Sequence, residues 1–168
     1  NKQFIVSRKQ NISENTEILK TKTKLKFTLE DYQQSLYEEI VNTIANATGD
    51  VLLSTYSIVG LNKLPELISA VKSVIKKGYS VYVFSRGMNY REDHLEGCTL
   101  LANLGCKIYG DIFNHSKGVI TPEQSMIFTA NIDGNHGLKN GFEVGVILEN
   151  DQTINLKSFI EWQISTAP

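Results

Sequence analysis

The chain has 168 residues, 41% of them hydrophobic and 21% charged, and its formal net charge is −1 at pH 7. This composition is typical of one globular domain whose core forms without disulfides or structural metal, and it excludes a disordered or fibrous protein. No apolar run approaches the roughly 18 residues of a transmembrane helix, and no signal peptide opens the sequence. We therefore expect a cytoplasmic protein without a membrane partner.

Basic residues gather at the N-terminal end. Residues 1–26 carry seven basic and two acidic side chains, a net charge of +5, and the rest of the chain has a net charge of −6. This asymmetry predicts a basic N-terminal arm with an edge strand over residues 1–28, followed by one folded domain over residues 29–168. A cationic arm can hold a phosphate backbone electrostatically, although most such charge runs are simply solvated. Because no methionine opens the sequence, we expect a piece of a longer or trimmed chain.

The first two thirds of the chain alternate predicted strands and helices. Lysine alternates with threonine or an apolar residue over 20–29, which predicts the edge strand. Thr28 resembles the N-cap of a helix that Gly49 ends. The next predicted elements are a buried strand at 51–58, a helix capped by Asn62 and ended by Gly78, a strand at 79–84, a helix at 95–104 and a strand at 106–109. This order predicts an α/β fold in which a mixed, largely parallel sheet has helices on both faces.

The last third of the chain changes pattern. Two short strands at 117–121 and 125–129 read as a hairpin, and a further strand follows at 143–148. A closing helix is predicted to use Leu156, Phe159, Ile160 and Ile164 for packing, with Trp162 and Tyr37 available for the core.

His115 is the histidine with a chemical context. It stands two residues before Lys117 at the entrance to a predicted strand, so the two side chains face the same side. A histidine that can act as a nucleophile and a lysine that can hold negative charge then face the same side of the chain. On its own, such a histidine–lysine pair more often has a structural role or is simply exposed. His94 and His136 are interpreted as solvated. Asn131, at the end of the next strand, can donate to a phosphoryl oxygen, and Glu143 can accept a hydrogen bond from the His115 ring.

The longer string around these residues has a recognisable order. It reads His115-Ser-Lys117-Gly-Val-Ile-Thr, then Met126-Ile-Phe-Thr129-Ala-Asn131-Ile-Asp133, then Asn140-Gly-Phe-Glu143-Val-Gly-Val. It closely resembles the catalytic half of the phospholipase D superfamily, whose pattern is H-x-K-x4-D-x6-G-S-x-N followed by a FEVGV-like strand. The resemblance covers about residues 50–150. It implies that residues 29–168 form a phospholipase D-like catalytic domain, half of a composite site.

The resemblance also implies residue roles. His115, Lys117, Asn131 and Glu143 would be catalytic, and Thr129, Ser116 and Arg86 would contact substrate. Arg86 additionally follows a predicted strand, where α/β sheets form ligand crevices, although a solvated loop arginine is common. The chain departs from the pattern at three points: Pro122, followed by Glu123, stands where the aspartate belongs, Phe128-Thr129 replaces Gly-Ser, and one residue is missing between His115 and Asn131.

The activity implied is metal-independent cleavage of nucleic-acid phosphodiester bonds through a phosphohistidine, with no cofactor. Since the chain holds one H-x-K motif, a dimer partner or a second phospholipase D-like half must complete the site. Two alternatives stay open: an inactive module that binds phosphate or nucleic acid, and a lipid phosphodiesterase. Cys98 and Cys106 fit no metal-ligand spacing and are interpreted as small apolar residues in a reducing compartment.

Overall fold

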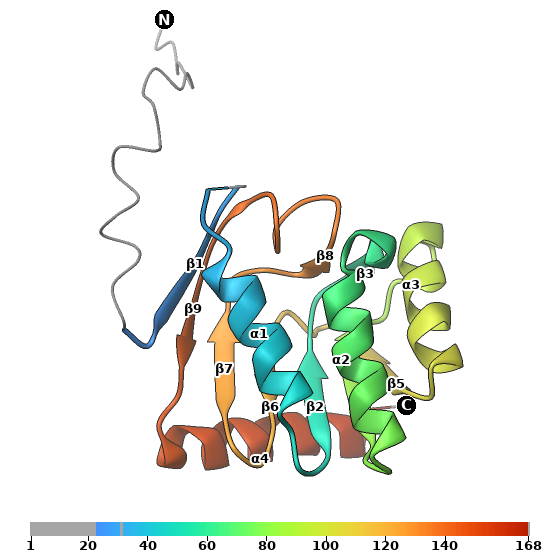
Figure 1. Cartoon of the computed structure of the whole chain (residues 1–168). Helices are drawn as coiled ribbons and strands as arrows, with labels where there is room; N and C mark the ends of the chain where they lie inside the picture. The colour runs from blue at the N-terminus through green and yellow to red at the C-terminus, as the bar shows by residue number, and fades with distance from the viewer. Residues whose placement is uncertain (1–22, 31, 168) are drawn as a thin grey trace, which may run out of the picture.

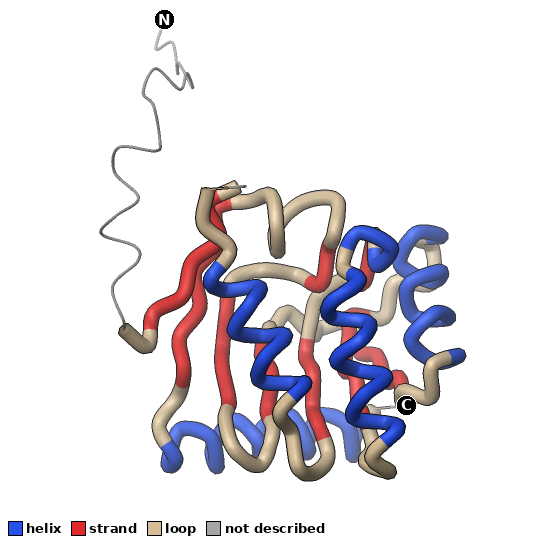
Figure 2. The backbone as a smooth tube through the Cα atoms, viewed as in Figure 1, coloured by secondary structure: helices blue, strands red, loops and turns tan. Residues whose placement is uncertain are grey.

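The structure is a computed structural model that describes residues 23–30 and 32–167. Of the predicted arm, residues 1–22 lie outside this described part. A seven-stranded sheet forms the centre of the molecule (Figures 1 and 2). Its strand order is β1 (Leu25–Leu29), β9 (Phe142–Ile147), β7 (Ser125–Phe128), β6 (Gly118–Ile120), β2 (Val51–Ser54), β4 (Val81–Arg86) and β5 (Lys107–Asp111). A small second sheet pairs β3 (Ile58–Val59) with β8 (Ile132–Asp133).

The main sheet is mixed, as the sequence predicts, but parallel pairing is confined to three strands. β2, β4 and β5 run parallel. The chain returns between them through α2 (Pro65–Lys76) and α3 (Glu92–Asn103), because parallel neighbours need such a crossover. All later connections reverse the chain, so β2–β6, β6–β7, β7–β9 and β9–β1 are antiparallel. The expectation of a largely parallel sheet is therefore corrected, because within the main sheet only β2, β4 and β5 pair in parallel.

Helices cover both faces of the sheet, which confirms the predicted layering. α1 (Ser35–Ala45) and α2 pack on one face, where their apolar side chains meet Leu53, Val83 and Val119 in the main core. α4 (Asn150–Thr166) crosses the opposite face, called the α4 face below (Figure 1). There Leu156, Ile160 and Ile164 pack on Leu52, Tyr82 and Ile120. No helix within residues 23–30 and 32–167 has the length and apolar character needed to cross a membrane.

Two helix predictions are wrong in detail. Thr28 does not cap α1; it lies in β1, where its hydroxyl donates to the carbonyl of Leu138 at 2.8 Å, and α1 begins seven residues later at Ser35. On α4, Trp162 and Phe159 are exposed and do not join the core, whereas Tyr37 is buried as predicted. The helix packs on the sheet through one narrow stripe, and helical spacing alone does not say how wide that stripe is.

Candidate active site

One edge of the sheet brings the candidate residues together. β2 ends at Ser54 opposite Gly118, the first residue of β6, so residues 55–57 and 115–117 leave the sheet side by side. β7 ends at Phe128 opposite Gly145 of β9. Antiparallel pairing therefore places the residues before β6, after β7 and at the start of β9 at one edge. These are the segments that carry His115, Thr129 and Glu143.

His115 and Lys117 face each other, as their spacing predicts. The Lys117 ammonium donates to Nδ1 of His115 at 3.1 Å and to the His115 carbonyl at 3.0 Å. The imidazole also packs edge-on against Tyr56, with ring centroids 5.1 Å apart. Partial burial lowers the pKa of Lys117, while the negative charge of Glu143 acts in the opposite direction. An exposed imidazole thus stands beside a partly desolvated cation.

Glu143 takes a different partner from the one expected. Its carboxylate accepts a hydrogen bond from the Thr129 hydroxyl, and the His115 ring is held by Lys117 instead. The Thr129 hydroxyl also accepts from the Val144 backbone N–H at 3.0 Å, which fixes it at the end of β7. Glu143 acts on the site through its charge on Lys117. The predicted contact between Glu143 and the histidine ring is therefore absent in this arrangement.

Asn131 lies at the turn between β7 and β8. The neighbouring Ile132 N–H donates to the Thr55 hydroxyl at 3.0 Å, which ties this turn to the end of β2. The Asn131 Oδ1 atom is buried and has no hydrogen-bond partner among the described residues. A buried amide atom without a partner costs free energy, so its place calls for an explanation. A Cβ atom on Gly137 would lie 3.4 Å from Oε1 of Glu143 and 3.9 Å from the Asn131 backbone nitrogen, which places all three residues at one corner.

Asn114 anchors the segment that carries His115, and the sequence analysis missed it. It is 1% exposed. Its amide donates to the carbonyl of Thr55, directly after β2, at 3.0 Å and to the carbonyl of Phe84, within β4, at 3.3 Å. Its Oδ1 accepts from the backbone N–H and the hydroxyl of Ser116 at 3.2 and 2.8 Å. Its position directly before His115 was the only signal in the sequence.

Ser116 belongs to this anchor. Its hydroxyl also meets the Ser54 hydroxyl at 2.7 Å. Because alternate residues of an extended segment face opposite sides, Ser116 points away from the side that His115 and Lys117 share. The Ser116 hydroxyl therefore lies in this anchor, away from the other candidate residues, and does not reach the place of the expected substrate contact.

His94 is buried, contrary to its interpretation as a solvated histidine. It is 2% exposed, and burial lowers its pKa. Its Nδ1 accepts from the Ile58 N–H at 3.0 Å, and its Nε2 lies 3.1 Å from the Arg86 carbonyl. The ring thus joins β3 to the end of β4. Gly97 marks the same close contact, because a Cβ there would lie 2.2 Å from the Ile58 carbonyl oxygen.

Arg86 is linked to the candidate site by the aromatic ring of Tyr56. Its guanidinium lies over the ring of Tyr56, 5.1 Å from the centroid, and Tyr56 in turn packs on His115. His94 holds the backbone carbonyl of Arg86, so the buried histidine positions this cation indirectly. Tyr56 is a further residue of the site that the sequence analysis did not single out.

The departure from the motif at Pro122 lies away from these residues. Pro122 is in the turn after β6, at the opposite end of that strand from Lys117. The next residue, Glu123, accepts from the backbone N–H and the hydroxyl of Thr48, and the hydroxyl bond is the largest cause of its lowered pKa. This acid therefore ties two turns together and takes no part in the His115 cluster.

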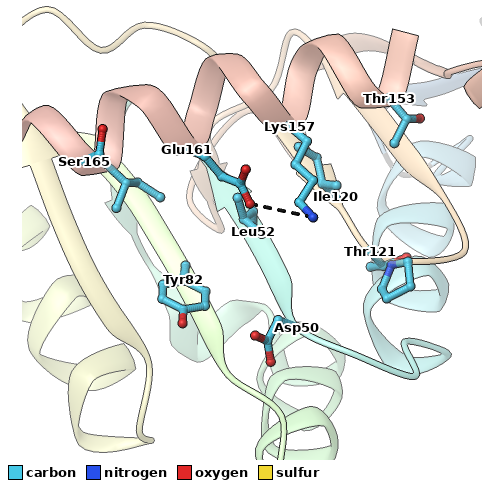
Figure 3. Close-up of a pocket in the computed structure, with 11 residues that line it drawn as sticks. Asp50, Leu52, Tyr82, Ile120, Thr121, Thr153, Lys157, Glu161 and Ser165 are labelled. Atoms are coloured by element: carbon cyan, nitrogen blue, oxygen red, sulfur yellow. Dashed lines mark ion pairs between the residues drawn. The ribbon is translucent and has the colours of Figure 1, made fainter. Parts of the chain in front are cut away.

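A cavity of about 540 Å³ lies under α4 and is separate from the cluster (Figure 3). Its walls combine residues of β2 and β4 and the end of β6 with one side of α4, and Lys157 and Glu161 form an ion pair of 3.7 Å along α4 (Figure 3). Neither His115 nor Lys117 lines it. Within the described ranges, no three histidine, cysteine, aspartate or glutamate side chains gather as a metal site.

The fold recurs in solved structures. Nuc from Salmonella typhimurium, a phospholipase D family member, is 16% identical and superposes with a TM-score of 0.70, covering 86% of this chain and 94% of that one. NucT from Helicobacter pylori is 17% identical with a TM-score of 0.67, covering 86% and 97%. TrmBL2, an archaeal chromatin protein described with a novel mode of DNA binding, is 11% identical with a TM-score of 0.57, covering 94% and 61%.

No protein-family model matches the chain, and no curated protein sequence matches it. The likeness is therefore one of structure, and it agrees with the ordered motif from His115 to Glu143. The chain has the fold of the phospholipase D superfamily.

Proposed function

We propose that this chain is a metal-independent phosphodiesterase that cleaves nucleic acid through a phosphohistidine at His115. The observation that carries the proposal is the contact between His115 and Lys117 at the strand edge of a phospholipase D-like fold. A nucleophile beside a fixed cation suits attack on an anionic phosphate, because the barrier lies largely in the charge that builds on the phosphoryl oxygens.

The proposed reaction has two steps. A neutral His115 attacks phosphorus, forming an N–P bond while the ester P–O bond breaks, and a second histidine gives its proton to the leaving oxygen. Water then attacks the phosphohistidine, the second histidine takes up its proton, and the N–P bond breaks. One ring must start neutral and the other protonated, a mixed state that is accessible near neutral pH.

Other residues of the cluster stabilise the developing charge. Lys117 supplies a positive charge. Partial burial strengthens the attraction between this charge and the phosphate, because fewer water molecules screen it. Asn131 supplies an amide at the same edge, and its Nδ2 group can donate to a phosphoryl oxygen. Glu143 and Thr129 hold the start of β9 against the end of β7, which keeps Lys117 opposite a carboxylate.

The second histidine of the proposed mechanism must come from outside the cluster around His115. Each chain has one H-x-K motif, and His94 has both ring nitrogens in contact with backbone atoms. We therefore propose that a second copy of the chain completes the site, as the resemblance to the superfamily implies. Each dimer then has one composite site with two copies of His115 and Lys117.

A cleavage assay tests the function. The purified chain is incubated in EDTA with end-labelled single- and double-stranded DNA, RNA and bis(p-nitrophenyl) phosphate, beside His115→Ala and the control His136→Ala. The His136 ring is exposed and makes no hydrogen bond within residues 23–30 and 32–167. Cleavage by the wild type and the control, with loss in His115→Ala, is expected. Equal cleavage by all three proteins would overturn the assignment, and loss with EDTA that Mg²⁺ or Mn²⁺ restores would favour metal-assisted chemistry.

One alternative has support in the comparisons. TrmBL2 shares the fold and is described as a DNA-binding chromatin protein. Binding of labelled DNA without cleavage of any substrate would assign this chain to a binding role instead.

A further inference from the structure

Two strongly exposed aromatic side chains lie on loops at the sheet edge that carries His115. Phe113 follows β5 and is 85% exposed, and Tyr90 follows β4 and is 78% exposed. Within residues 23–30 and 32–167, no other large hydrophobic side chain is exposed to this degree. Single exposed apolar residues are common on folded domains, so the position of these two rings decides whether they have a role.

The chain fixes Phe113 beside the candidate nucleophile. The Phe113 backbone N–H donates to Oδ1 of Asp111 at 2.8 Å, in the turn that follows β5. The next side chain, Asn114, is buried, and its amide donates to two backbone carbonyls, so it points into the fold. The side chains before and after it, Phe113 and His115, are exposed. Their Cα atoms are at most about 7 Å apart, so the Phe113 ring can reach a base next to the phosphate that His115 attacks.

The loop that carries Tyr90 runs beside the turn that carries Phe113. Arg86 and Asp111 are paired residues at the ends of the parallel strands β4 and β5. The Gly87 N–H then donates to the Asp111 carbonyl at 3.0 Å, so the two strands continue side by side into their loops. Tyr90 stands three residues further along. The two exposed rings therefore belong to adjacent loops at one edge of the sheet.

A cation without an acidic partner accompanies these rings. The Arg86 guanidinium lies 5.1 Å from the centroid of the Tyr56 ring and forms no ion pair within the described part of the chain. Arg91, in contrast, pairs with Asp93 at 2.7 Å. Lys117 is a second cation at this edge. A nucleic-acid strand presents phosphates and bases in turn, and proteins hold the phosphates with cations and the bases with aromatic rings.

We infer that Phe113, with Tyr90 beside it, forms a stacking surface for the unpaired bases of a strand whose phosphate lies at His115. Bases in a duplex are paired and stacked inside it, so a ring at the backbone reaches their faces only where the strands are separated. Stacking is tolerant of sequence, because every base has an aromatic face. The inference rests on the proposed function for the choice of nucleic acid, and it narrows the substrate to single strands.

Binding to matched strands tests the inference without any need for cleavage. All proteins carry His115→Ala so that no strand is cut. Fluorescence anisotropy measures the Kd for three labelled probes of about 12 nucleotides: a thymidine strand, the same backbone with abasic sites throughout, and a duplex. Phe113→Ala should raise the Kd for the thymidine strand about tenfold, because one stacked base is lost. The Kd for the abasic strand and for the duplex should stay unchanged.

Two control variants separate the ring from its surroundings. Phe113→Tyr keeps an aromatic ring and should bind the thymidine strand like the parent protein. Phe159→Ala removes a ring that is 47% exposed on the α4 face, and it should also bind like the parent. Because the Phe113 ring is exposed, Phe113→Ala should unfold in urea at the parent's midpoint and sediment with the parent's mass.

Each outcome decides the inference. Equal affinity of Phe113→Ala and Phe159→Ala for the thymidine strand would overturn it. An equal loss on the thymidine and abasic strands would also overturn it, because the ring would then contact the backbone. A changed sedimenting mass in Phe113→Ala would assign the ring to a contact between chains and overturn it as well. Base-dependent binding through Phe113, by a chain that cleaves no phosphodiester when His115 is restored, supports the stacking surface and contradicts the proposed function instead.

Discussion

The Lys117 ammonium lies 3.1 Å from Nδ1 of His115. An ammonium has only N–H donors, so Nδ1 accepts and the ring proton of neutral His115 sits on Nε2. The proton-donating copy of the proposed mechanism is instead protonated on both ring nitrogens, so its Nδ1 cannot accept from Lys117. The attacking copy of His115 needs its ring proton on Nδ1 and the Lys117 ammonium turned toward the phosphate. The Glu143 carboxylate is then the group that accepts the hydrogen bond from Nδ1–H.

Replacing Lys117 by methionine separates charge from shape. We expect Lys117→Met to lower kcat by about 10²–10³, because it removes charge stabilisation that matters most in the transition state. Folding should be little changed, since the side chain is partly exposed and makes no ion pair within residues 23–30 and 32–167. The assay is steady-state hydrolysis of bis(p-nitrophenyl) phosphate, with Lys76→Met, an exposed lysine of α2, as control. Wild-type kcat in Lys117→Met would remove the lysine from the mechanism.

Asn114 should be the polar residue whose loss costs most stability. Asn114→Ala leaves the buried Thr55 carbonyl without its donor and removes one of the two donors to the Phe84 carbonyl, which keeps the Thr55 backbone N–H, so unfolding in urea should show a loss of about 2–3 kcal/mol. Asn140→Ala, at an exposed amide, should change stability by less than about 0.5 kcal/mol. Equal effects of the two substitutions would show that the Asn114 contacts carry no net free energy.

His94 should make stability depend on pH. Its folded pKa lies below that of the unfolded chain because burial disfavours the charged ring, so the unfolded state binds more protons. The free energy of unfolding should therefore be highest above the unfolded pKa of about 6.5 and fall as pH drops below it, by at most about 1.4 kcal/mol per pH unit. Urea unfolding from pH 8 to 5 measures this slope.

The matched variants isolate the group responsible. His94→Gln should flatten the slope, and His136→Gln, which replaces an exposed histidine, should keep it. A slope that persists in His94→Gln would assign the pH dependence to another group.

The sequence predicts those features of the fold and the site that depend on local residue spacing and on the order of the motif. Helical spacing located α2 and α3, and the ordered motif located the strand edge where His115, Lys117 and Glu143 lie. The contacts of His94 and Asn114 were not predictable, because each depends on backbone groups of strands brought near only by folding. The hydrogen-bond partner of Glu143 was not predictable for the same reason. The spacing along the strand places the carboxylate at the site, but it does not determine whether Thr129 or His115 donates to it.

Mixing two forms of the chain tests the composite site most directly. Wild type is combined with a ninefold excess of His115→Ala under conditions that allow subunits to exchange, and hydrolysis per wild-type chain is measured. If one site needs two copies of His115, random pairing leaves only about one tenth of the wild-type chains with a wild-type partner, so activity should fall to about a tenth of the unmixed value. Activity that stays at the unmixed value per wild-type chain would show that each chain carries an independent site, and would contradict the account.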